Sequence, residues 1–255
     1  MTTRARAEDQ TPSREDVERS IRQRVGRFDF GALAAALARD GYALLPGLLR
    51  REECDAARAW YGEPERFRKR VDLARHGFGD RGEYQYFRRP LPPRVAALQR
   101  ELYTPLARVA NAWNAGLRNP PHHPERLAEL RQRCRDAGQE QPTPLLLSYE
   151  TGGYNCLHQD LYGEVAFPLQ VAIGLSRPGR DYEGGAFLLV EQRPRKQSRG
   201  EAIVLAQGEG VVFPTAERPV EGKRGWSRAR VRHGVSRVTR GERMTLGIIF
   251  HDARS

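Results

Sequence analysis

Few cysteines, few lysines and no long apolar run characterise this 255-residue sequence. The three cysteines are odd in number and widely spaced, so neither a disulfide framework nor a cysteine-based zinc motif is predicted, and reduced, mostly buried thiols are expected. No stretch approaches the ~20 apolar residues of a membrane-spanning helix. The polar N-terminus lacks the apolar segment of a signal peptide. We therefore expect a cytoplasmic protein.

The positive charge of the chain is carried almost entirely by arginine. The net charge is +11, and only three of the 43 basic residues are lysines: Lys69, Lys196 and Lys223. One interpretation is attraction to the phosphates of a nucleic acid. The other is an arginine-rich composition on ordinary solvated faces. Because arginine is scattered as well as clustered, composition alone leaves both open.

The first 140 residues are predicted to be mainly helical. Apolar residues recur at helical spacing, which predicts helices over residues 28–39, 50–61, 93–117 and 124–137, with a break at Pro120-Pro121 and a short strand over 41–47. Residues 1–20 lack this pattern, so we expect a flexible tail that forms a helix at most from Ser13 onward.

Short apolar runs separated by turn residues follow from about residue 141. They predict strands over residues 145–150, 155–159, 169–175, 186–191, 201–205, 210–213, 230–236 and 243–251. Strands at this spacing favour an all-β barrel or sandwich. The expected fold class is therefore an all-β core with flanking N-terminal α-helices, α+β overall. We expect a single domain over residues 21–255, with helical support in 21–140 and the β core in 141–255.

His158-Gln159-Asp160 is the sequence feature with the clearest chemistry. If residues 157–161 are extended, His158 and Asp160 project to the same face, because strand side chains alternate. A further histidine, His233, lies in a short alternating run typical of a strand. Two imidazoles and one carboxylate form a facial triad for Fe(II), which leaves three coordination positions for a chelating cosubstrate and O2. We predict that His158, Asp160 and His233 bind the metal and are the catalytic residues.

Arg243 opens the apolar run 243–250, ten residues after His233. A dicarboxylate that chelates iron through one end needs a fixed cation at the other end. The forked, permanently charged guanidinium suits that role. Each of these features is common alone, and their order along predicted strands makes the combination specific.

The order His158-x-Asp160, His233, Arg243 resembles the 2-oxoglutarate- and Fe(II)-dependent dioxygenases. Within that superfamily, Tyr149 and Gly152 before His-Gln-Asp are similar to the AlkB-type pattern. A closer likeness, from about residue 41 to 254, is to a bacterial oxygenase family thought to act on damaged nucleic acid. It is carried by residues 154–163 (YNCLHQDLYG), 191–195 (EQRPR) and 247–252 (GIIFHD).

This resemblance implies a double-stranded β-helix (jelly-roll) core and Fe(II), 2-oxoglutarate and O2 as cofactor and cosubstrates. It implies binding of 2-oxoglutarate by Arg243, assisted by Tyr149. Thr245, which lies on the same face as Arg243 if that strand is regular, is a weaker candidate for the same pocket. The expected substrate is an alkylated base in single-stranded or flipped-out nucleic acid, and the expected reaction is oxidative demethylation in DNA repair. Preference for DNA or RNA and oligomeric state stay open.

The sequence departs from AlkB at three positions. Leu147 stands where AlkB has an asparagine, Ile249 where it has a second arginine, and Tyr162 where it has the aspartate that contacts the base. The metal and cosubstrate residues carry over, whereas the base-contacting residues do not. Tyr162 is therefore only a candidate for substrate contact.

Two further segments are candidates for the substrate site. Residues 67–89 combine glycines, arginines and aromatic residues, including Tyr84, Tyr86 and Phe87, which predicts either a mobile substrate lid or a structural loop over the barrel mouth. Arg193 and Arg195 lie in a basic cluster, 193–200, on an expected loop, and a third basic cluster surrounds Trp226.

Two other functions remain open at this point. The same iron chemistry would serve a hydroxylase of a protein side chain or small molecule, and the run 184–187 (GGAF) is similar to prolyl-hydroxylase-type barrels. A non-enzymatic, basic nucleic-acid-binding protein is the other alternative. Such a protein would bind nucleic acid independently of iron and form no succinate.

Overall fold

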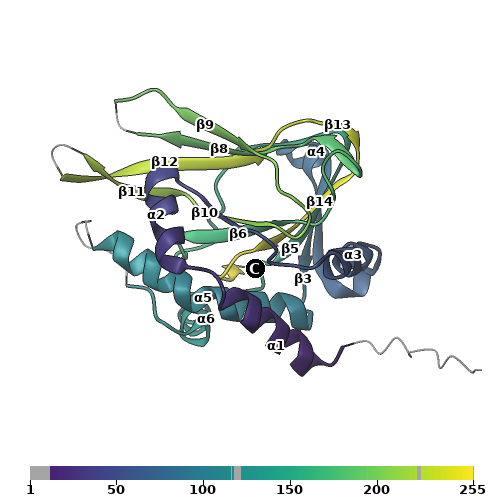
Figure 1. Cartoon of the computed structure of the whole chain (residues 1–255), viewed down its shortest axis with the longest axis horizontal. Coiled ribbons are helices and arrows are strands. Elements are labelled where there is room, and N and C mark those ends of the chain that lie inside the picture. The colour runs from purple at the N-terminus through teal and green to yellow at the C-terminus, as the bar shows by residue number, and fades with distance from the viewer. Residues whose placement is uncertain (1–11, 116, 118–121, 194, 223–224, 255) are drawn as a thin grey trace, which may run out of the picture.

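The computed structural model describes residues 12–115, 117, 122–193, 195–222 and 225–254 (Figure 1). Its helices are α1 (Arg14–Val25), α2 (Phe30–Asp40), α3 (Arg51–Ala59), α4 (Leu73–His76), α5 (Pro93–Asn114) and α6 (Leu127–Asp136), with short 3-10 turns η1 (Trp60–Gly62) and η2 (Pro64–Arg66). No helix of the described part of the chain is long and apolar enough to cross a membrane. The three cysteines are free, two of them buried and Cys156 exposed.

The strands form a large curled antiparallel sheet and two small ones. They are β1 (Ala43–Leu45), β2 (Phe67–Asp72), β3 (Gly79–Phe87), β4 (Gln139–Gln141), β5 (Leu145–His158), β6 (Leu169–Gly174), β7 (Tyr182–Gly184), β8 (Phe187–Gln192), β9 (Arg199–Ile203), β10 (Gly210–Pro214), β11 (Glu217–Gly222), β12 (Gly225–Val235), β13 (Val238–Gly241), β14 (Arg243–Ile248) and β15 (Ala253–Arg254). The main sheet runs β1-β10-β6-β14-β5-β12-β8-β9, with β11 paired to β12 and the β2–β3 hairpin paired to β5. The expected fold class, a β core with N-terminal helices and α+β overall, is confirmed.

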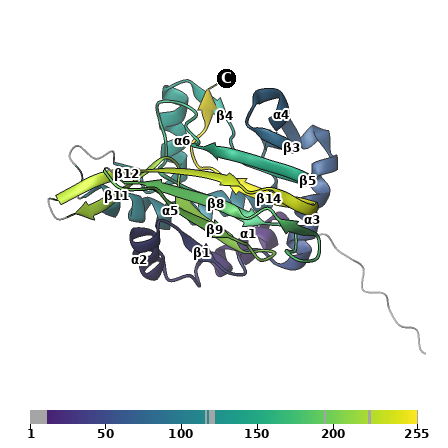
Figure 2. The ribbon, with the colours of Figure 1, turned by 90° about the horizontal axis from the view of Figure 1, so that it is seen from above.

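The helices cover one side of the curled sheet. Figures 1 and 2 show α1, α5 and α6 against it, with the β8–β9 and β11–β12 hairpins projecting together at the end away from α3. Along α5, Leu98, Leu102 and Leu106 recur at helical spacing and are fully buried. The α5 residue Tyr103 packs against Phe167 and Phe250. This apolar contact fixes the sheet on its helical support, and burial of each such side chain contributes roughly 1.5–3 kcal/mol.

A helix occupies part of the segment for which a flexible tail was expected. Residues 1–11 lie outside the described residues, but the helix α1 begins at Arg14. The Ser13 side chain caps it by accepting a hydrogen bond from the Asp16 backbone N–H at 3.1 Å. Ile21 is fully buried, and an ion pair joins Glu18 to Arg100 of α5 at 3.1 Å. Tertiary packing of one apolar face thus stabilises a segment whose composition alone indicated a tail.

Residues 67–89 do not form the predicted loop. They form the hairpin of β2 and β3 with α4 at its turn, and β3 pairs with β5 from Gly79 to Tyr86. A Cβ at Gly82 would approach the ring of Tyr149 to 2.6 Å, so this glycine permits close packing of two strands. The glycines and charges that indicated a loop are therefore accommodated within the sheet.

The strand β5 is one long strand, although the sequence predicted two. Its first half pairs with β14, and its second half pairs with β12. This single strand therefore links β14, which pairs with residues 145–149, to β12, which pairs with β5 near its end at His158. The predicted break of the helix at Pro120-Pro121 lies outside the described residues, and α5 ends at Asn114.

Candidate active site

The two histidines of the predicted triad face each other across neighbouring strands. His158, the last residue of β5, is the antiparallel register partner of His233 on β12. Their ring centroids lie 4.2 Å apart. Directly opposed residues on antiparallel strands have side chains on the same face at short range, so sheet pairing alone brings two distant parts of the sequence together.

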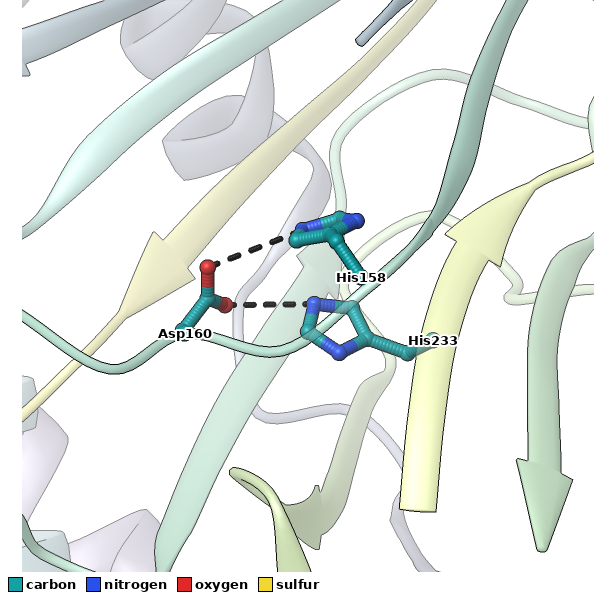
Figure 3. A group of neighbouring side chains, drawn as sticks. All are labelled: His158, Asp160 and His233. Atoms are coloured by element: carbon teal, nitrogen blue, oxygen red, sulfur yellow. Dashed lines mark ion pairs between the residues drawn. The ribbon is translucent and has the colours of Figure 1, made fainter.

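Asp160 completes the group just beyond the end of β5. Its two carboxylate oxygens lie 3.6 Å from His158 Nε2 and 3.1 Å from His233 Nε2 (Figure 3). The ligand atoms of all three residues lie within 4.8 Å of one another. The strand β5 ends at His158, so residues 159–161 are not part of a regular strand. The side chains of His158 and Asp160 nevertheless lie on the same side, as predicted.

Hydrogen bonds and burial set the protonation state of the group. His158 Nδ1 lies 2.8 Å from the Cys156 carbonyl, which favours the tautomer that leaves Nε2 free to bind a metal. Burial and the neighbouring His233 lower the pKa of His158, which favours the neutral ring. Burial opposes ionisation of Asp160, but both histidines and the Tyr162 hydroxyl hold its pKa well below the usual range. Neutral imidazoles and a carboxylate are the forms that bind a metal ion.

These residues fit Fe(II) by their chemistry. Two imidazole nitrogens and one carboxylate converge on one point, and the set of ligands is that of a 2-His-1-carboxylate site. His233 Nδ1 is buried and has no hydrogen-bond partner among the described residues. The three side chains lie on one side of the predicted metal position, and they line a cavity.

Arg243 and Tyr149 form a second opposed pair, on β14 and β5. The guanidinium carbon of Arg243 lies 5.7 Å from the centroid of the Tyr149 ring. The Arg243 side chain lines the same cavity as the triad, together with Tyr149 and Thr245. All three predicted cosubstrate residues thus face the space beside the predicted metal ligands.

The guanidinium of Arg243 lacks a counter-ion within the described structure. It is 3% exposed, and its Nε and Nη1 atoms have no hydrogen-bond partner there. Burial lowers the pKa of Arg243, and the nearby Tyr149 and Tyr182 partly offset this effect. A buried, unpaired cation is costly, so this site is suited to an anionic group that enters the cavity.

Gly185 makes room for the Arg243 side chain. Its φ is +58°, and a Cβ there would approach Arg243 Cδ to 2.8 Å. In this chain, the space needed by the Arg243 side chain explains the glycine at position 185, in the run that indicated a similarity to prolyl hydroxylases.

Sequence reasoning missed two polar residues of this cavity, Asn155 and Gln170. The Asn155 amide donates to the Tyr149 hydroxyl at 3.4 Å, while its Oδ1 atom has no partner among the described residues. Gln170 is 3% exposed and its Nε2 atom is likewise without a partner there. Gln170 could have been noticed in the sequence, because it is the single polar residue in the apolar run 169–174.

Three tyrosines form the wall of the cavity beside Asp160. Tyr84, Tyr86 and Tyr162 line it, and the ring centroids of Tyr86 and Tyr162 lie 6.4 Å apart at 86°. The Tyr162 hydroxyl donates to Asp160 Oδ1 at 2.8 Å. Burial raises the pKa of each of the three phenols, which therefore stay neutral.

The remaining substrate candidates lie elsewhere. Phe87 is fully buried and stacks on Phe67 with centroids 4.9 Å apart, on the opposite face of β3 from Tyr84 and Tyr86. Arg193 and Arg195 follow β8, and the Nε atom of Arg193 donates to Glu191 at 2.6 Å. Phe87, Arg193 and Arg195 are absent from the described lining of the cavity. Because side chains alternate along a strand, Phe87 points away from the face of β3 that Tyr84 and Tyr86 share.

Comparison with solved structures shows which proteins share this fold. The oxidoreductase of the 2OG-Fe(II) oxygenase family from Burkholderia pseudomallei superposes with a TM-score of 0.54 at 16% identity, covering 89% of this chain and 94% of that one. The α-ketoglutarate-dependent epimerase SnoN of nogalamycin biosynthesis gives 0.55 at 14%, covering 89% and 85%. A prolyl-4-hydroxylase from Pseudomonas putida gives 0.50 at 16%, covering 89% and 100%. At these identities the likeness concerns the fold.

Sequence comparison is more specific. Residues 82–253 match the model of a family described as an oxygenase catalysing oxidative methylation of damaged DNA. Two uncharacterized proteins of Mycobacterium tuberculosis, from strains CDC 1551 and H37Rv, are each 52% identical over 164 residues, which is 64% of this chain and 70% of theirs.

The fold is that of the Fe(II)- and 2-oxoglutarate-dependent oxygenases, and His158, Asp160 and His233 form a candidate iron site in it. Since the family model covers most of the chain, the protein belongs to the family of oxygenases described as acting on damaged DNA. The family resemblance predicted from the sequence is confirmed, and the alternative of a non-enzymatic binding protein is not supported.

Proposed function

We propose that this oxygenase removes alkyl groups oxidatively from bases of single-stranded or flipped-out nucleic acid. The observation that carries the proposal is one cavity that joins the triad, a buried unpaired Arg243 and a tyrosine wall, in a chain whose family is described as acting on damaged DNA.

The metal and cosubstrate are assigned to this chain's residues as follows. His158, Asp160 and His233 would hold Fe(II), and Arg243, whose Nε and Nη1 atoms have no partner among the described residues, would bind a carboxylate of 2-oxoglutarate. Tyr149 fixes the guanidinium from the opposite strand, and Thr245 lies two residues along β14 on the same face. When bound, iron and 2-oxoglutarate supply the O2-dependent oxidation of a substrate C–H bond.

The tyrosine wall is suited to a flat aromatic substrate. Tyr84, Tyr86 and Tyr162 offer aromatic surface and neutral hydroxyls beside Asp160. Stacking on aromatic side chains recognises a base without a sequence preference and contributes roughly 1–3 kcal/mol per base. A base in a duplex reaches this enclosed site only after unstacking, at a cost of a few kcal/mol.

The family description speaks of oxidative methylation, and we propose demethylation because an oxygenase brings oxygen and no methyl group. Hydroxylation of an N-methyl group gives a hemiaminal. Its C–N bond breaks, the nitrogen retains the electron pair and gains a proton, and formaldehyde leaves. The balance is one O2 and one 2-oxoglutarate consumed, with succinate, CO2, formaldehyde and the repaired base formed.

Arg193 and Arg195 are proposed to contact the nucleic-acid strand outside the cavity. Both follow β8 on the projecting hairpin (Figure 1). Contacts of this kind are made to phosphates, depend on salt and do not read sequence.

A substrate panel tests the proposal. Succinate and formaldehyde are measured with Fe(II), 2-oxoglutarate and O2 on single-stranded oligonucleotides that carry N-methylated bases, with matched unmethylated strands as control. We expect both products to rise together only with the methylated strand. A parallel arm offers peptides and small metabolites. Succinate that rises there, without formaldehyde from methylated strands, would assign the same iron site to a hydroxylase of side chains or small molecules.

A further inference from the structure

A second hollow lies on the other side of the segment that carries the metal ligands. His158, Asp160 and Tyr162 line the triad cavity, whereas the alternate residues Gln159 and Leu161 line this second hollow. We name it the Gln159 groove, lined by Trp113, His123, Gln159, Leu161, Phe167 and Arg230. A short stretch of backbone thus separates an occupant of the groove from the predicted metal ligands.

The groove lies between the C-terminal end of α5 and the β11–β12 hairpin, which Figure 1 shows on the same side of the molecule. Its inner wall is aromatic. His123 stands edge-on to Phe167, with centroids 5.2 Å apart at 75°. Trp113 borders the same wall, and Leu161, 57% exposed, forms part of the rim.

His123 carries an unsatisfied polar atom in this wall. The side chain is 5% exposed, and its Nε2 atom has no hydrogen-bond partner in the described part of the chain. Asn111 holds the residue in place by bonding both its backbone N–H, at 2.9 Å, and its carbonyl, at 2.8 Å. A buried nitrogen without a partner costs free energy, so a polar group of a ligand would be favoured there.

Arginines supply the charge on the opposite side of the groove. Arg228 and Arg230 alternate with buried residues on β12 and are exposed. Arg228 pairs with Glu217 at 3.5 Å, a half-exposed contact that leaves it largely in solvent, and Arg230 has no ion-pair partner among the described residues. Cations facing an aromatic wall are complementary to a base joined to a phosphate.

We infer that the Gln159 groove binds a neighbouring nucleotide of the single strand whose alkylated base enters the triad cavity. The base lies against Leu161 and beside His123, which the fully buried Phe167 supports from behind, and its phosphate lies at Arg228 and Arg230. The inference rests on the proposed function for the identity of the ligand, and it adds a second contact that would orient the strand.

Binding without turnover tests this site. The full chain is titrated, without iron or 2-oxoglutarate, into a fluorescein-labelled, unmethylated 12-nucleotide single strand, and anisotropy is followed at several salt concentrations. The Arg230→Ala protein should bind roughly threefold to tenfold more weakly, with a salt slope lower by about one phosphate contact. Arg232 is exposed on the same face of the same strand but lies outside the groove lining. The Arg232→Ala protein is the matched control and should bind within twofold of the unchanged protein.

His123→Phe tests the aromatic wall. It keeps the backbone contacts to Asn111 and an aromatic ring beside Phe167, and it replaces the five-membered imidazole by a six-membered carbon ring without nitrogens. Its melting temperature, measured alongside, should stay close to that of the unchanged protein. We expect its affinity for the single strand to fall roughly threefold to tenfold. Equal losses in the Arg230→Ala and Arg232→Ala proteins, or unchanged affinity in the His123→Phe protein, overturn the inference. Because no turnover is measured, failure here is distinguishable from failure of the proposed reaction.

Discussion

At the scale of single residues, two cross-strand pairs organise the site. His158 opposes His233, and Tyr149 opposes Arg243. Each pair joins parts of the sequence that lie far apart, and both pairs share β5 as one partner. A single strand with the correct register therefore places the predicted metal ligands and the predicted cosubstrate residues together.

Arg243→Met is predicted to separate cosubstrate binding from stability. The half-saturating 2-oxoglutarate concentration should rise roughly tenfold to a hundredfold, because a charge-assisted pair contributes about 1.5–3 kcal/mol. The melting temperature without 2-oxoglutarate should stay the same or rise, since the buried Nε and Nη1 atoms of Arg243 have no partner among the described residues. Succinate kinetics and thermal unfolding measure the two effects.

Arg218→Met is the matched control for that prediction. Arg218 is also buried, but it bonds to Glu191 and, at 2.7 Å, to the Ala38 carbonyl. Its loss leaves the buried Glu191 carboxylate with Arg193 as its remaining partner and should lower stability, by at most about 3–5 kcal/mol. A strongly destabilised Arg243→Met protein with unchanged 2-oxoglutarate affinity would contradict the role assigned to Arg243.

Tyr162→Phe is predicted to weaken metal binding. The Tyr162 hydroxyl donates to Asp160 Oδ1 at 2.8 Å and so orients the carboxylate of a predicted metal ligand. Loss of such a contact lowers metal affinity roughly tenfold. Calorimetric titration with Mn(II), a redox-stable substitute for Fe(II), measures this effect without turnover. Tyr84→Phe removes a hydroxyl of the same wall that makes no hydrogen bond to Asp160, so it should leave the affinity for Mn(II) unchanged. Equal affinities in the two variants would contradict the role of Tyr162.

At the scale of elements, the sequence predicted the strongly apolar strands and the long helix of the core, but it did not predict the strand β3. The strands β6, β8 and β10 and the helix α5 lie close to their predicted ranges, because each is a strongly apolar or periodic run. The strand β3 was interpreted as a loop from its glycines and charges. Its pairing with β5 stabilises it, and such tertiary pairing overrides local preference.

The site was predictable to the extent that it is local. His158-x-Asp160 and the arginine at the start of β14 are visible in the sequence, whereas the register that opposes His158 to His233 is a tertiary property. Phe87 was misplaced because the face of β3 could not be assigned without its partner strand. Asn155 was missed because one polar residue in a strand carries little signal.

Gly185→Ala is predicted to disturb the cosubstrate site through a strand turn. Alanine would be strained at the positive φ of this position. Its Cβ would also approach Arg243 Cδ to 2.8 Å and so displace the guanidinium. Strain alone costs roughly 1–3 kcal/mol. Gly179→Ala is the matched control, because Gly179 has φ +75° and nothing within 4 Å of a Cβ. Both variants should have a lower melting temperature than the unchanged protein, but only Gly185→Ala should weaken 2-oxoglutarate binding. Equal 2-oxoglutarate affinities in the two variants would contradict the steric argument.

At the scale of the whole molecule, two buried neutral histidines make stability depend on pH. Burial lowers the pKa of His251 to about 4 and that of His123 to about 4. The unfolded chain takes up protons near pH 6.5, whereas the folded chain resists them until about pH 4. Stability is therefore full above pH 6.5 and falls as the pH drops, by roughly 2 kcal/mol per histidine between pH 6.5 and 5.

Thermal unfolding at pH 7.5 and pH 5 measures this dependence. His251→Asn is the informative variant, since an amide oxygen can replace Nδ1 as the acceptor of the Phe167 N–H at 3.2 Å. The variant should lose some stability at pH 7.5 and show a smaller drop toward pH 5. An unchanged difference between the two pH values would contradict the assignment of His251.

The central claim is oxidative removal of an alkyl group at the triad, and the stoichiometry of its products tests it most directly. Formaldehyde and succinate are quantified in one reaction on an N-methylated single strand, with the His158→Ala protein as control. We predict one formaldehyde for each succinate above the unmethylated background, and neither product from the His158→Ala protein, whose fold should persist because His158 ends its strand at the cavity. Succinate without methyl-dependent formaldehyde, or full activity in the His158→Ala protein, would contradict the account.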